Sequence, residues 1–425
     1  MTNNDQIVQE PIGAGFADLG IAPAILEVLE RLKYSTPTPI QQQAIPTAIQ
    51  GKDVVGIAQT GTGKTLAFGI PMIQRLAQAP GRGLVILPTR ELALQVDEAL
   101  KRVGAGLGIT TTVLIGGTSL MPQTRALGRN PRIVIATPGR LIDHLNQRTL
   151  TLNAVRILVL DEADRMLDMG FAPQIRRIFE YLPKERQTML FSATMPKEIM
   201  SLATAQMKLP IRVEVAPAGT TAERVTQELF IVLKNDKNRL IEKLLGTHAM
   251  TTLIFTRTKH GAKRLTQTIR DMGHTVAEIH SNRSLNQRRD ALDGFKSGKY
   301  RVLVATDIAS RGIDVQGIGL VINYDVPTDA EDYVHRIGRT ARAGAGGHAI
   351  TLVTPEQRGE IRDIERLVRK TLPVSQLPEL PPQRARSRAG SRGQFWTREP
   401  SPKPRPLKGF FGKRALSAKT LSLVA

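Results

Sequence analysis

Short hydrophobic runs alternate with longer amphipathic segments from Lys52 onward. The runs are rich in β-branched and aliphatic residues, and the segments between them carry apolar residues at helical spacing. This alternation predicts successive βα units around a mainly parallel sheet. The predicted strands of the first series are Val54 to Ile57, Leu84 to Leu87, Thr112 to Ile115, Ile133 to Ile135, Ile157 to Leu160 and Met189 to Phe191.

A second series of the same kind follows a polar stretch of small residues, 217–225, which is typical of a linker. Its predicted strands are Glu228 to Val232, Thr252 to Phe255, Val276 to Ile279, Val302 to Val304, Leu320 to Ile322 and Ala349 to Leu352. We therefore expect two tandem α/β domains with mainly parallel sheets, at 1–216 and 226–372. The length of 425 residues supports two cores rather than one.

Residues 373–425 lose hydrophobic periodicity and are rich in proline, arginine, serine and glycine, which predicts a disordered basic tail. The chain carries a formal net charge of +21, and about +10 of it lies after Gln383. Such an excess favours a polyanionic partner, either nucleic acid or an anionic membrane surface. Aromatic residues in the tail could stack on unpaired bases, or the tail could be a solvated extension.

Cysteine is absent, which excludes disulfides, thiol catalysis and cysteine metal sites. The N-terminus shows no basic segment followed by an apolar core, and no stretch reaches the ~18 apolar residues of a membrane helix. We expect a cytoplasmic protein without a membrane partner.

A glycine-rich segment lies between the first predicted strand and a predicted helix. Its residues are Ala58, Gln59, Thr60, Gly61, Thr62, Gly63, Lys64 and Thr65. In this context it predicts a P-loop that binds ATP, because glycines let backbone N–H groups converge on phosphate oxygens at a helix N-terminus. Lys64 would neutralise the β and γ phosphates, and the Thr65 hydroxyl would bind Mg²⁺. The alternative is a glycine-rich turn with an exposed lysine, and Ala58 replaces the first glycine of the usual pattern.

Acidic residues between Asp161 and Asp164 follow the strand that ends at Leu160. They resemble a Walker B site, in which Asp161 would hold Mg²⁺ through water and Glu162 would polarise the attacking water. An acidic helix N-cap is the alternative. Several segments with such chemistry follow predicted strands, and parallel sheets bind ligands at the carboxyl ends of their strands. Because these segments would lie at the same edge of the sheet, they favour a single nucleotide-binding site.

These segments resemble the motifs of the DEAD-box RNA helicases of superfamily 2, over about Phe16 to Leu372. The resemblance implies two RecA-like domains and RNA-stimulated ATP hydrolysis, coupled to local duplex unwinding or to remodelling of RNA–protein complexes. In a Q motif at about 14–42, Gln41 would read adenine while Phe16 stacks on it. Phe16 could instead pack against the following helix.

Further family motifs imply contacts with RNA and coupling between the two ligands. Largely sequence-independent contacts with the RNA backbone are implied for Pro88, Thr89, Arg90, Gly117, Thr137, Gly139, Arg140, Arg288 and Thr306. A role in coupling ATP to strand separation is implied for Asp164, Ser192, Thr194, His335 and Arg336. Arg336 would pair with acids of the first domain. Each short group alone is more typical of a helix cap or turn.

The second domain would complete the ATP site. Arg339 and Arg342 are three residues apart, so on a predicted helix they share a face and suit two arginine fingers that reach the γ-phosphate. By the same resemblance, Asp307 and Asp314 would contact the ribose or order these arginines. A solvated basic helix is the commoner explanation for such spacing alone.

Three segments depart from the family pattern, and in the first of them Ser281 occupies a glycine position. Leu285 occupies a glutamine position three residues before Arg288, and Gln287 is a candidate substitute for that glutamine. Ala341 replaces a glycine of the last motif and is tolerated if its φ is negative. Lys33 replaces a glycine of the Q motif, with little consequence expected.

The layout of a short N-terminus and a brief basic tail is most similar to the bacterial RhlE-type subgroup. We expect a monomer whose lobes close when ATP and RNA bind together, and partners in ribosome assembly or RNA decay. Two alternatives remain at this stage. A noncatalytic RNA clamp is disfavoured by the intact Lys64 and Glu162, and a DNA-directed motor is disfavoured by the Q motif together with the DEAD sequence.

Overall fold

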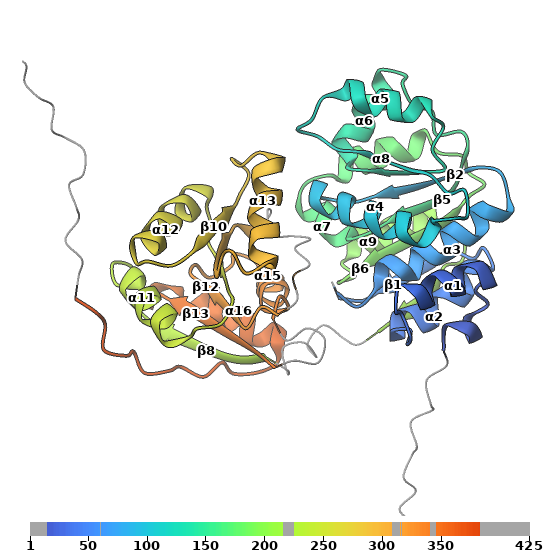
Figure 1. The fold of residues 1–425 in the computed structure, drawn as a ribbon. Coiled ribbons are helices and arrows are strands. Elements are labelled where there is room, and N and C mark those ends of the chain that lie inside the picture. Colours follow the sequence, from blue (N-terminus) through green and yellow to red (C-terminus); the bar gives the residue numbers. More distant parts are fainter. Residues whose placement is uncertain are drawn as a thin grey trace, which may run out of the picture. The chain divides into compact units, whose positions relative to one another are not determined.

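The computed structural model describes residues 15–59, 61–215, 225–307, 315, 317–340 and 346–382. The described residues all lie within Met1–Pro382 and form the two predicted domains, here called the first and second lobes (Figure 1). Apart from Val225, the predicted linker lies outside the described residues, and so does the chain after Pro382.

The first lobe is built on a parallel sheet in the order β3-β4-β2-β5-β6-β1-β7. Its strands are β1 (Val54–Ile57), β2 (Arg82–Ile86), β3 (Thr111–Leu114), β4 (Ile133–Ala136), β5 (Val155–Leu160), β6 (Gln187–Ser192) and β7 (Ile211–Glu214). The first six confirm the predicted runs. Strand β7 was not predicted, because it is an edge strand in which only Val213 is buried.

Helices and one 3₁₀ segment (η1) flank this sheet. They are η1 (Phe16–Leu19), α1 (Pro23–Arg31), α2 (Pro39–Ile49), α3 (Lys64–Gln78), α4 (Arg90–Gly104), α5 (Leu120–Gly128), α6 (Pro138–Asn146), α7 (Ala163–Asp168), α8 (Ala172–Glu180) and α9 (Lys197–Gln206). Local sequence explains several starts. Proline occupies the first turn of α1, α2 and α6, where its missing N–H costs nothing.

The second lobe is also built on a parallel sheet, with its strands in the order β10-β11-β9-β12-β13-β8. Its strands are β8 (Val225–Ile231), β9 (Thr252–Phe255), β10 (Val276–Ile279), β11 (Val302–Ala305), β12 (Leu320–Asn323) and β13 (Gly347–Val353). Its helical segments are α11 (Lys237–Thr247), α12 (Lys259–Asp271), α13 (Leu285–Lys296), α15 (Ala330–Ile337), η2 (Pro355–Gln357) and α16 (Arg358–Val368). The second predicted strand series is confirmed.

The second lobe extends ten residues beyond the expected boundary at Leu372. The Leu229 N–H donates to the Pro373 carbonyl (2.9 Å), and the Ser375 N–H donates to the Leu229 carbonyl (2.8 Å). Near the end of this segment, the Arg239 guanidinium donates to the Pro381 carbonyl (2.6 Å). Residues 373–375 therefore pair with the edge strand β8, and Pro381 is held by α11. These hydrogen bonds to backbone groups hold the segment without the hydrophobic periodicity that would have marked it in the sequence.

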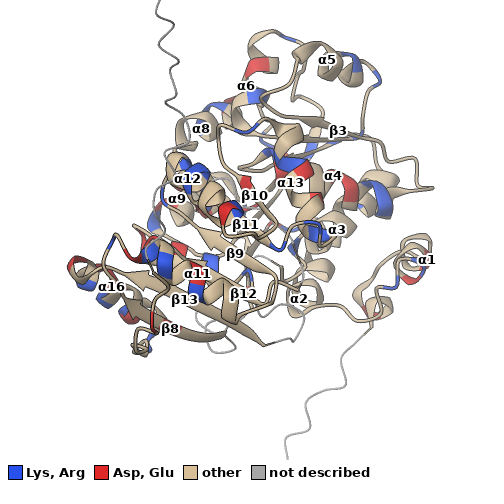
Figure 2. Ribbon diagram, turned by 60° about the vertical axis from the view of Figure 1, so that its left-hand side comes forward, with Lys and Arg blue, Asp and Glu red and all other residues tan. Residues whose placement is uncertain are grey.

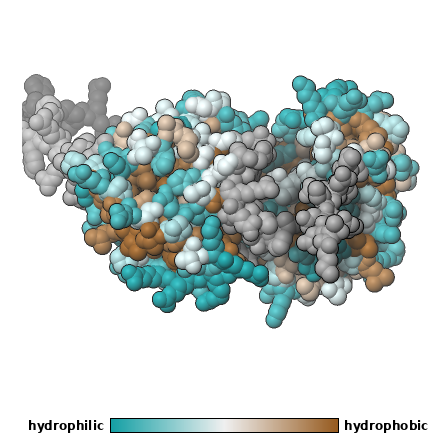
Figure 3. All heavy atoms as spheres, turned by 90° about the horizontal axis from the view of Figure 1, so that it is seen from below, coloured by the Kyte–Doolittle hydropathy of each residue, from teal (hydrophilic) through white to brown (hydrophobic). Residues whose placement is uncertain are grey.

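Alternate residues along the inner strands of the first lobe enter hydrophobic clusters on opposite faces of the sheet, as expected for a sheet covered on both sides. In β1, for example, Val54 belongs to one cluster and Val55 to the other. On the face drawn in Figure 3, apolar surface residues are interspersed with hydrophilic ones. No described helix combines the length and apolar character needed to cross a membrane.

Candidate active site and RNA interface

The glycine-rich segment joins β1 to α3, as a P-loop requires. Gly61 and Gly63 have φ values of 89° and 91°, a region that glycine enters without strain. Gly63 also has no room for a side chain, since a Cβ there would lie 2.3 Å from the Gln41 Nε2. Lys64 opens α3 and is buried, while Thr65 beside it is half-buried. Thr60 lies outside the described residues.

Gln41 uses both ends of its amide within the first lobe. Its Oε1 accepts a hydrogen bond from the Thr38 N–H (2.9 Å), which caps α2, and its Nε2 donates to the Gly63 carbonyl (3.0 Å). Gln41 therefore ties the Q motif to the P-loop. Phe16 is buried in the first-lobe core, at 5% exposure, which is the packing role left open for it from the sequence.

Lys64 and Glu162 form a buried ion pair between the P-loop and the Walker B segment. The Lys64 Nζ lies 3.3 Å from the Glu162 Oε1, and the Arg165 Nε lies 2.9 Å from the Oε2. Glu162 has a φ of 56° at the N-cap of α7. A left-handed conformation is uncommon for glutamate, and such strain clusters at functional sites.

The two Walker B carboxyls have opposite protonation tendencies. Burial, together with the charge of Glu162, raises the pKa of Asp161 to about 7, although Lys64 opposes the shift. Burial also favours protonation of Glu162, but the positive charges of Arg165 and Lys64 outweigh it and hold the pKa of Glu162 well below its usual range. Glu162 is therefore an anion at neutral pH, as a residue that polarises water must be.

Arg165 is a site residue that the sequence analysis missed. It is almost fully buried, and from the first turn of α7 it contacts Glu162, the N-cap residue of that helix. The i,i+3 spacing of an arginine after the glutamate was the available signal. The short acidic motif drew attention only to its own four residues.

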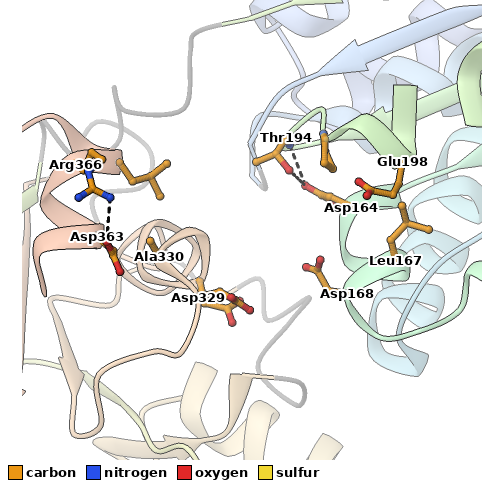
Figure 4. Close-up of a pocket in the computed structure, with 12 residues that line it drawn as sticks. Asp164, Leu167, Asp168, Thr194, Glu198, Asp329, Ala330, Asp363 and Arg366 are labelled. Carbon is orange, nitrogen blue, oxygen red and sulfur yellow. Dashed lines mark hydrogen bonds and ion pairs between the residues drawn. The ribbon is translucent and has the colours of Figure 1, made fainter. Parts of the chain in front are cut away.

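Asp164 joins the Walker B segment to the segment after β6. Its Oδ2 accepts hydrogen bonds from the Ala193 N–H (3.0 Å), the Thr194 N–H (2.9 Å) and the Thr194 hydroxyl (3.2 Å). In return, the Asp164 N–H donates to the Ser192 hydroxyl (3.1 Å). The predicted coupling residues Asp164, Ser192 and Thr194 therefore lie together, and Figure 4 shows the Asp164–Thr194 contact.

A cavity of about 770 Å³ lies beside this contact (Figure 4). Its acidic lining residues are Asp164, Asp168, Glu198, Asp329, Asp332 and Asp363. Arg366 also lines it and is already paired with Asp363 at 3.0 Å. Because acidic side chains repel phosphate groups, this cavity is not where ATP or RNA phosphates would bind.

Three arginines of the predicted RNA interface lie close together. Burial lowers the pKa of Arg90, and repulsion from Arg288 and Arg140 lowers it further, against the opposing effect of Glu91. Like charges brought together in this way favour an anionic ligand. Basic residues occur over both lobes, as Figure 2 shows, but this group belongs to the segments that the family motifs single out.

Gly117 is required for the position of Arg90. Its φ is 75°, and a Cβ at this position would lie 1.9 Å from the Arg90 Nη1. Arg140 is held nearby, since its Nη2 donates to the Thr118 carbonyl (2.9 Å). The loop after β3 therefore contacts both arginines, and the spacing of the motifs did not predict this direct contact.

The remaining first-lobe RNA candidates have local roles. Thr89 caps α4, where its hydroxyl accepts a hydrogen bond from the Leu92 N–H (3.3 Å). Thr137 is the N-cap residue of α6, and a Cβ at Gly139 would meet nothing within 4 Å. Pro88 precedes Thr89, in the connection between β2 and α4. For Thr89 the helix cap named as an alternative is present.

Arg336 pairs within its own lobe, which corrects the prediction that it pairs with first-lobe acids. Its Nε and Nη2 lie 2.6 and 2.7 Å from the two carboxylate oxygens of Asp307. Its Nη1 also donates to the Asp325 carbonyl (2.6 Å), and its guanidinium lies over the Phe255 ring. Asp307 therefore orders an arginine, as the sequence suggested, but that arginine is Arg336. Thr306, the residue that precedes Asp307, is buried.

Helix α15 ends at Ile337, so Arg339 is not on it and the predicted helical face shared with Arg342 is wrong. Gly338 is the C-cap, and the Arg339 Nε donates back to the His335 carbonyl (3.2 Å). His335 and Arg339 both contribute to lowering the pKa of Glu162. Arg342 and Asp314 lie outside the described residues.

The donor atoms near the P-loop suit a hard cation. Thr65 offers a hydroxyl oxygen and Asp161 a buried carboxylate oxygen, the ligand types that Mg²⁺ prefers. No group of three or more His, Cys, Asp or Glu residues arranged to hold a metal occurs in the described part of the chain. That is compatible with Mg²⁺, which keeps several waters and takes phosphate oxygens as ligands.

A tandem pair of parallel α/β lobes with a P-loop and a paired acidic motif is typical of nucleotide-dependent helicases. Comparison with family models gives the particular family: residues 38–202 match the DEAD/DEAH box helicase domain and residues 236–344 the helicase conserved C-terminal domain. A protein of Meyerozyma guilliermondii named ATP-dependent rRNA helicase RRP3 is 45% identical over 343 residues, 80% of this chain and 72% of the relative. The chain belongs to the DEAD-box helicases of superfamily 2.

Solved structures agree with this assignment. Saccharomyces cerevisiae Dbp5 bound to RNA and ADP BeF3 superimposes with a TM-score of 0.76 at 30% identity, covering 85% of this chain and 95% of Dbp5. A DEAD box protein from Methanococcus jannaschii is 36% identical with the same coverage of this chain and 99% of its own, but its TM-score is 0.51. The predicted RecA-like fold is confirmed.

Proposed function

We propose that this protein, which is an ATP-dependent RNA helicase of the DEAD-box family, couples ATP hydrolysis to local unwinding of RNA or remodelling of RNA–protein complexes. The observation that carries the proposal is the connected pair of contacts around the acidic motif. Glu162 pairs with the P-loop through Lys64, and Asp164 pairs with Thr194. Two residues of one short segment, Glu162 and Asp164, are thus the proposed hydrolytic base and the proposed link toward RNA.

In this mechanism the γ-phosphate of ATP competes with Glu162 for the Lys64 ammonium. Glu162, released from Lys64 but still held by Arg165, accepts a hydrogen bond from the attacking water and orients it. Thr65 and Asp161, the latter through water, would hold Mg²⁺, which neutralises phosphate charge. Arg339 would stabilise the charge that develops on the transferred phosphate.

RNA would bind through its backbone to the arginine group of Arg90, Arg140 and Arg288, without reading bases. Binding on both lobes makes closure favourable for both ligands, so ATP and RNA raise each other's affinity. When ATP is hydrolysed, Asp164 and Thr194 would pass the change to the segment after β6. Gln41 and Phe16 are proposed to contribute to the adenine site.

The finer assignments are narrower proposals. The rRNA helicase names of the yeast relatives favour a role in ribosome assembly over one in RNA decay. They give no support to the RhlE-type subgroup, which stays a prediction, as do the monomeric state and the cytoplasmic location.

An ATPase assay with and without single-stranded RNA, and with single-stranded DNA in parallel, tests the proposal. We expect strong stimulation by RNA, little by DNA, and none with Lys64→Ala. Equal stimulation by DNA would identify a DNA-directed motor. RNA binding without ATP turnover would identify a noncatalytic clamp.

A further inference from the structure

Leu285, which occupies a glutamine position of the family pattern, contacts the other lobe. It is the first residue of α13, is half-buried and packs against a hydrophobic cluster of the first lobe. The other described members of that cluster all lie between Phe16 and Val215. Among the described residues, Leu285 is thus the second-lobe side chain that reaches this core.

The polar residues around Leu285 are committed elsewhere. The Gln287 side chain accepts a hydrogen bond from the Ser284 N–H (3.1 Å), and the Ser284 hydroxyl accepts one from the Gln287 N–H (3.3 Å), which forms a capping box for α13. Gln287 therefore uses its side-chain oxygen to cap α13. The start of α13 is fixed by its cap, so the Leu285 side chain has a defined position.

An ion pair one turn further along α13 joins the same two lobes. The Arg288 Nη2 lies 2.8 Å from the Glu91 Oε1, and both side chains are almost buried, at 11% and 12% exposure. Glu91 is the neighbour of Arg90, whose pKa is lowered in part by Arg288. The contact between α13 and the first lobe is therefore adjacent to the arginine group proposed to bind RNA.

The comparison structures include a helicase bound to both RNA and nucleotide. Dbp5 bound to RNA and ADP BeF3 matches 85% of this chain, which includes residues of both lobes, with a TM-score of 0.76. A chain of this fold therefore binds RNA and nucleotide together in that relative.

We propose that Leu285 is a positioning residue that stabilises lobe closure through an apolar contact. The proposal rests on the proposed function, because closure matters only if ATP and RNA drive it. When the lobes separate, Leu285 becomes exposed to water, so its burial favours the closed state and, through it, the binding of RNA. Half-burial of one leucine corresponds to about a fivefold shift in that equilibrium.

The test compares Leu285→Gln with Leu285→Met in the full chain. Glutamine has similar length but is polar, whereas methionine keeps the apolar contact. Leu377→Gln, an exposed leucine of the second lobe away from α13, serves as the matched control. We expect Leu285→Gln to raise the RNA concentration for half-maximal ATPase about fivefold, while ATP affinity without RNA stays unchanged. Leu285→Met and Leu377→Gln should behave as wild type.

A second readout separates closure from direct RNA contact. The chain has no cysteine, so Lys184→Cys and Lys243→Cys place one fluorophore on each lobe. With an ATP analogue and no RNA, Leu285→Gln should lower the ratio of closed to open molecules about fivefold relative to wild type. If that ratio is unchanged, or if the glutamine and methionine variants are indistinguishable while wild type remains RNA-stimulated, the proposal is overturned. Wild type without RNA stimulation would instead overturn the proposed function.

Discussion

The Lys64 ammonium lies 3.3 Å from the Glu162 carboxylate, so the phosphate-binding lysine and the candidate base neutralise each other. Both side chains are buried, at 5% and 2% exposure. A buried pair of this kind is costly to break from one side, because the remaining charge loses its partner. Arg165 changes that balance here, since it keeps Glu162 paired when Lys64 turns to a phosphate.

Replacing Glu162 with glutamine should separate binding from hydrolysis. Glutamine keeps the size of the side chain but cannot polarise water as a base, so RNA-stimulated turnover should fall by about 10²–10⁴-fold. ATP affinity should be retained, because Lys64 loses the anion that competes with phosphate. Steady-state ATPase and equilibrium binding of a fluorescent ATP analogue measure the two effects. Glu185→Gln, a change at an exposed glutamate, is the control. Near-normal turnover in Glu162→Gln would remove Glu162 from the chemistry.

A substitution at Gln41 distinguishes two roles of the Q motif, which are holding the P-loop and reading adenine. Gln41→Glu keeps the acceptor for the Thr38 N–H but places an anionic oxygen against the Gly63 carbonyl. Loss of that hydrogen bond, with added repulsion, should weaken nucleotide binding by about 1–3 kcal/mol. If the residue acts by holding the P-loop, ATP and CTP affinities should fall by the same factor. A selective loss of ATP affinity would show that adenine reading dominates instead.

Gly117→Ala should weaken RNA binding without affecting ATP. The new Cβ would overlap the Arg90 guanidinium and displace it from the arginine group. Gly106→Ala is a matched control, because Gly106 has a φ of 82° but a Cβ there meets nothing within 4 Å. Both variants carry the same backbone strain, so only Gly117→Ala should raise the dissociation constant for RNA, about tenfold for one lost charge-assisted contact. Equal RNA affinity in the two variants would mean that Arg90 does not bind RNA.

The strands were predictable because each buried strand is a short run of hydrophobic residues that can be recognised from its own sequence. Strands β1, β9 and β10 were predicted to the residue. Strand β7 and residues 373–382 were missed, since an edge strand with one buried side chain and a segment held by backbone bonds carry no apolar pattern.

The places of the site residues in the fold were predictable, but the side chains with which they pair were less so. The acidic motif and the P-loop follow strands whose ends meet at one sheet edge, so their proximity could be inferred. The pairing of Arg336 with Asp307 could not be, because it depends on where two distant segments of the second lobe meet. Likewise, spacing alone could not show that α15 would end before Arg339.

Lys33 is the departure from the family pattern with a measurable cost to stability. It was expected to matter little, but its φ is 61°, just after α1, where the Tyr34 N–H donates back to the Leu29 carbonyl (2.9 Å). This is the position after a helix that favours glycine, since a Cβ destabilises the left-handed conformation. After allowing for the greater freedom of glycine in the unfolded chain, Lys33→Gly should stabilise the first lobe by about 0.5–1 kcal/mol.

Thermal unfolding checks this prediction, with an expected rise in Tm of about 1–4 °C for the first-lobe transition. Lys33→Ala is the control, because it removes the same exposed side chain but keeps a Cβ in the left-handed region. If alanine stabilises as much as glycine, the cost comes from the lysine charge or side chain and not from the backbone. If neither variant shifts Tm, the turn after α1 relaxes around lysine without strain, and the sequence-based expectation of little consequence stands.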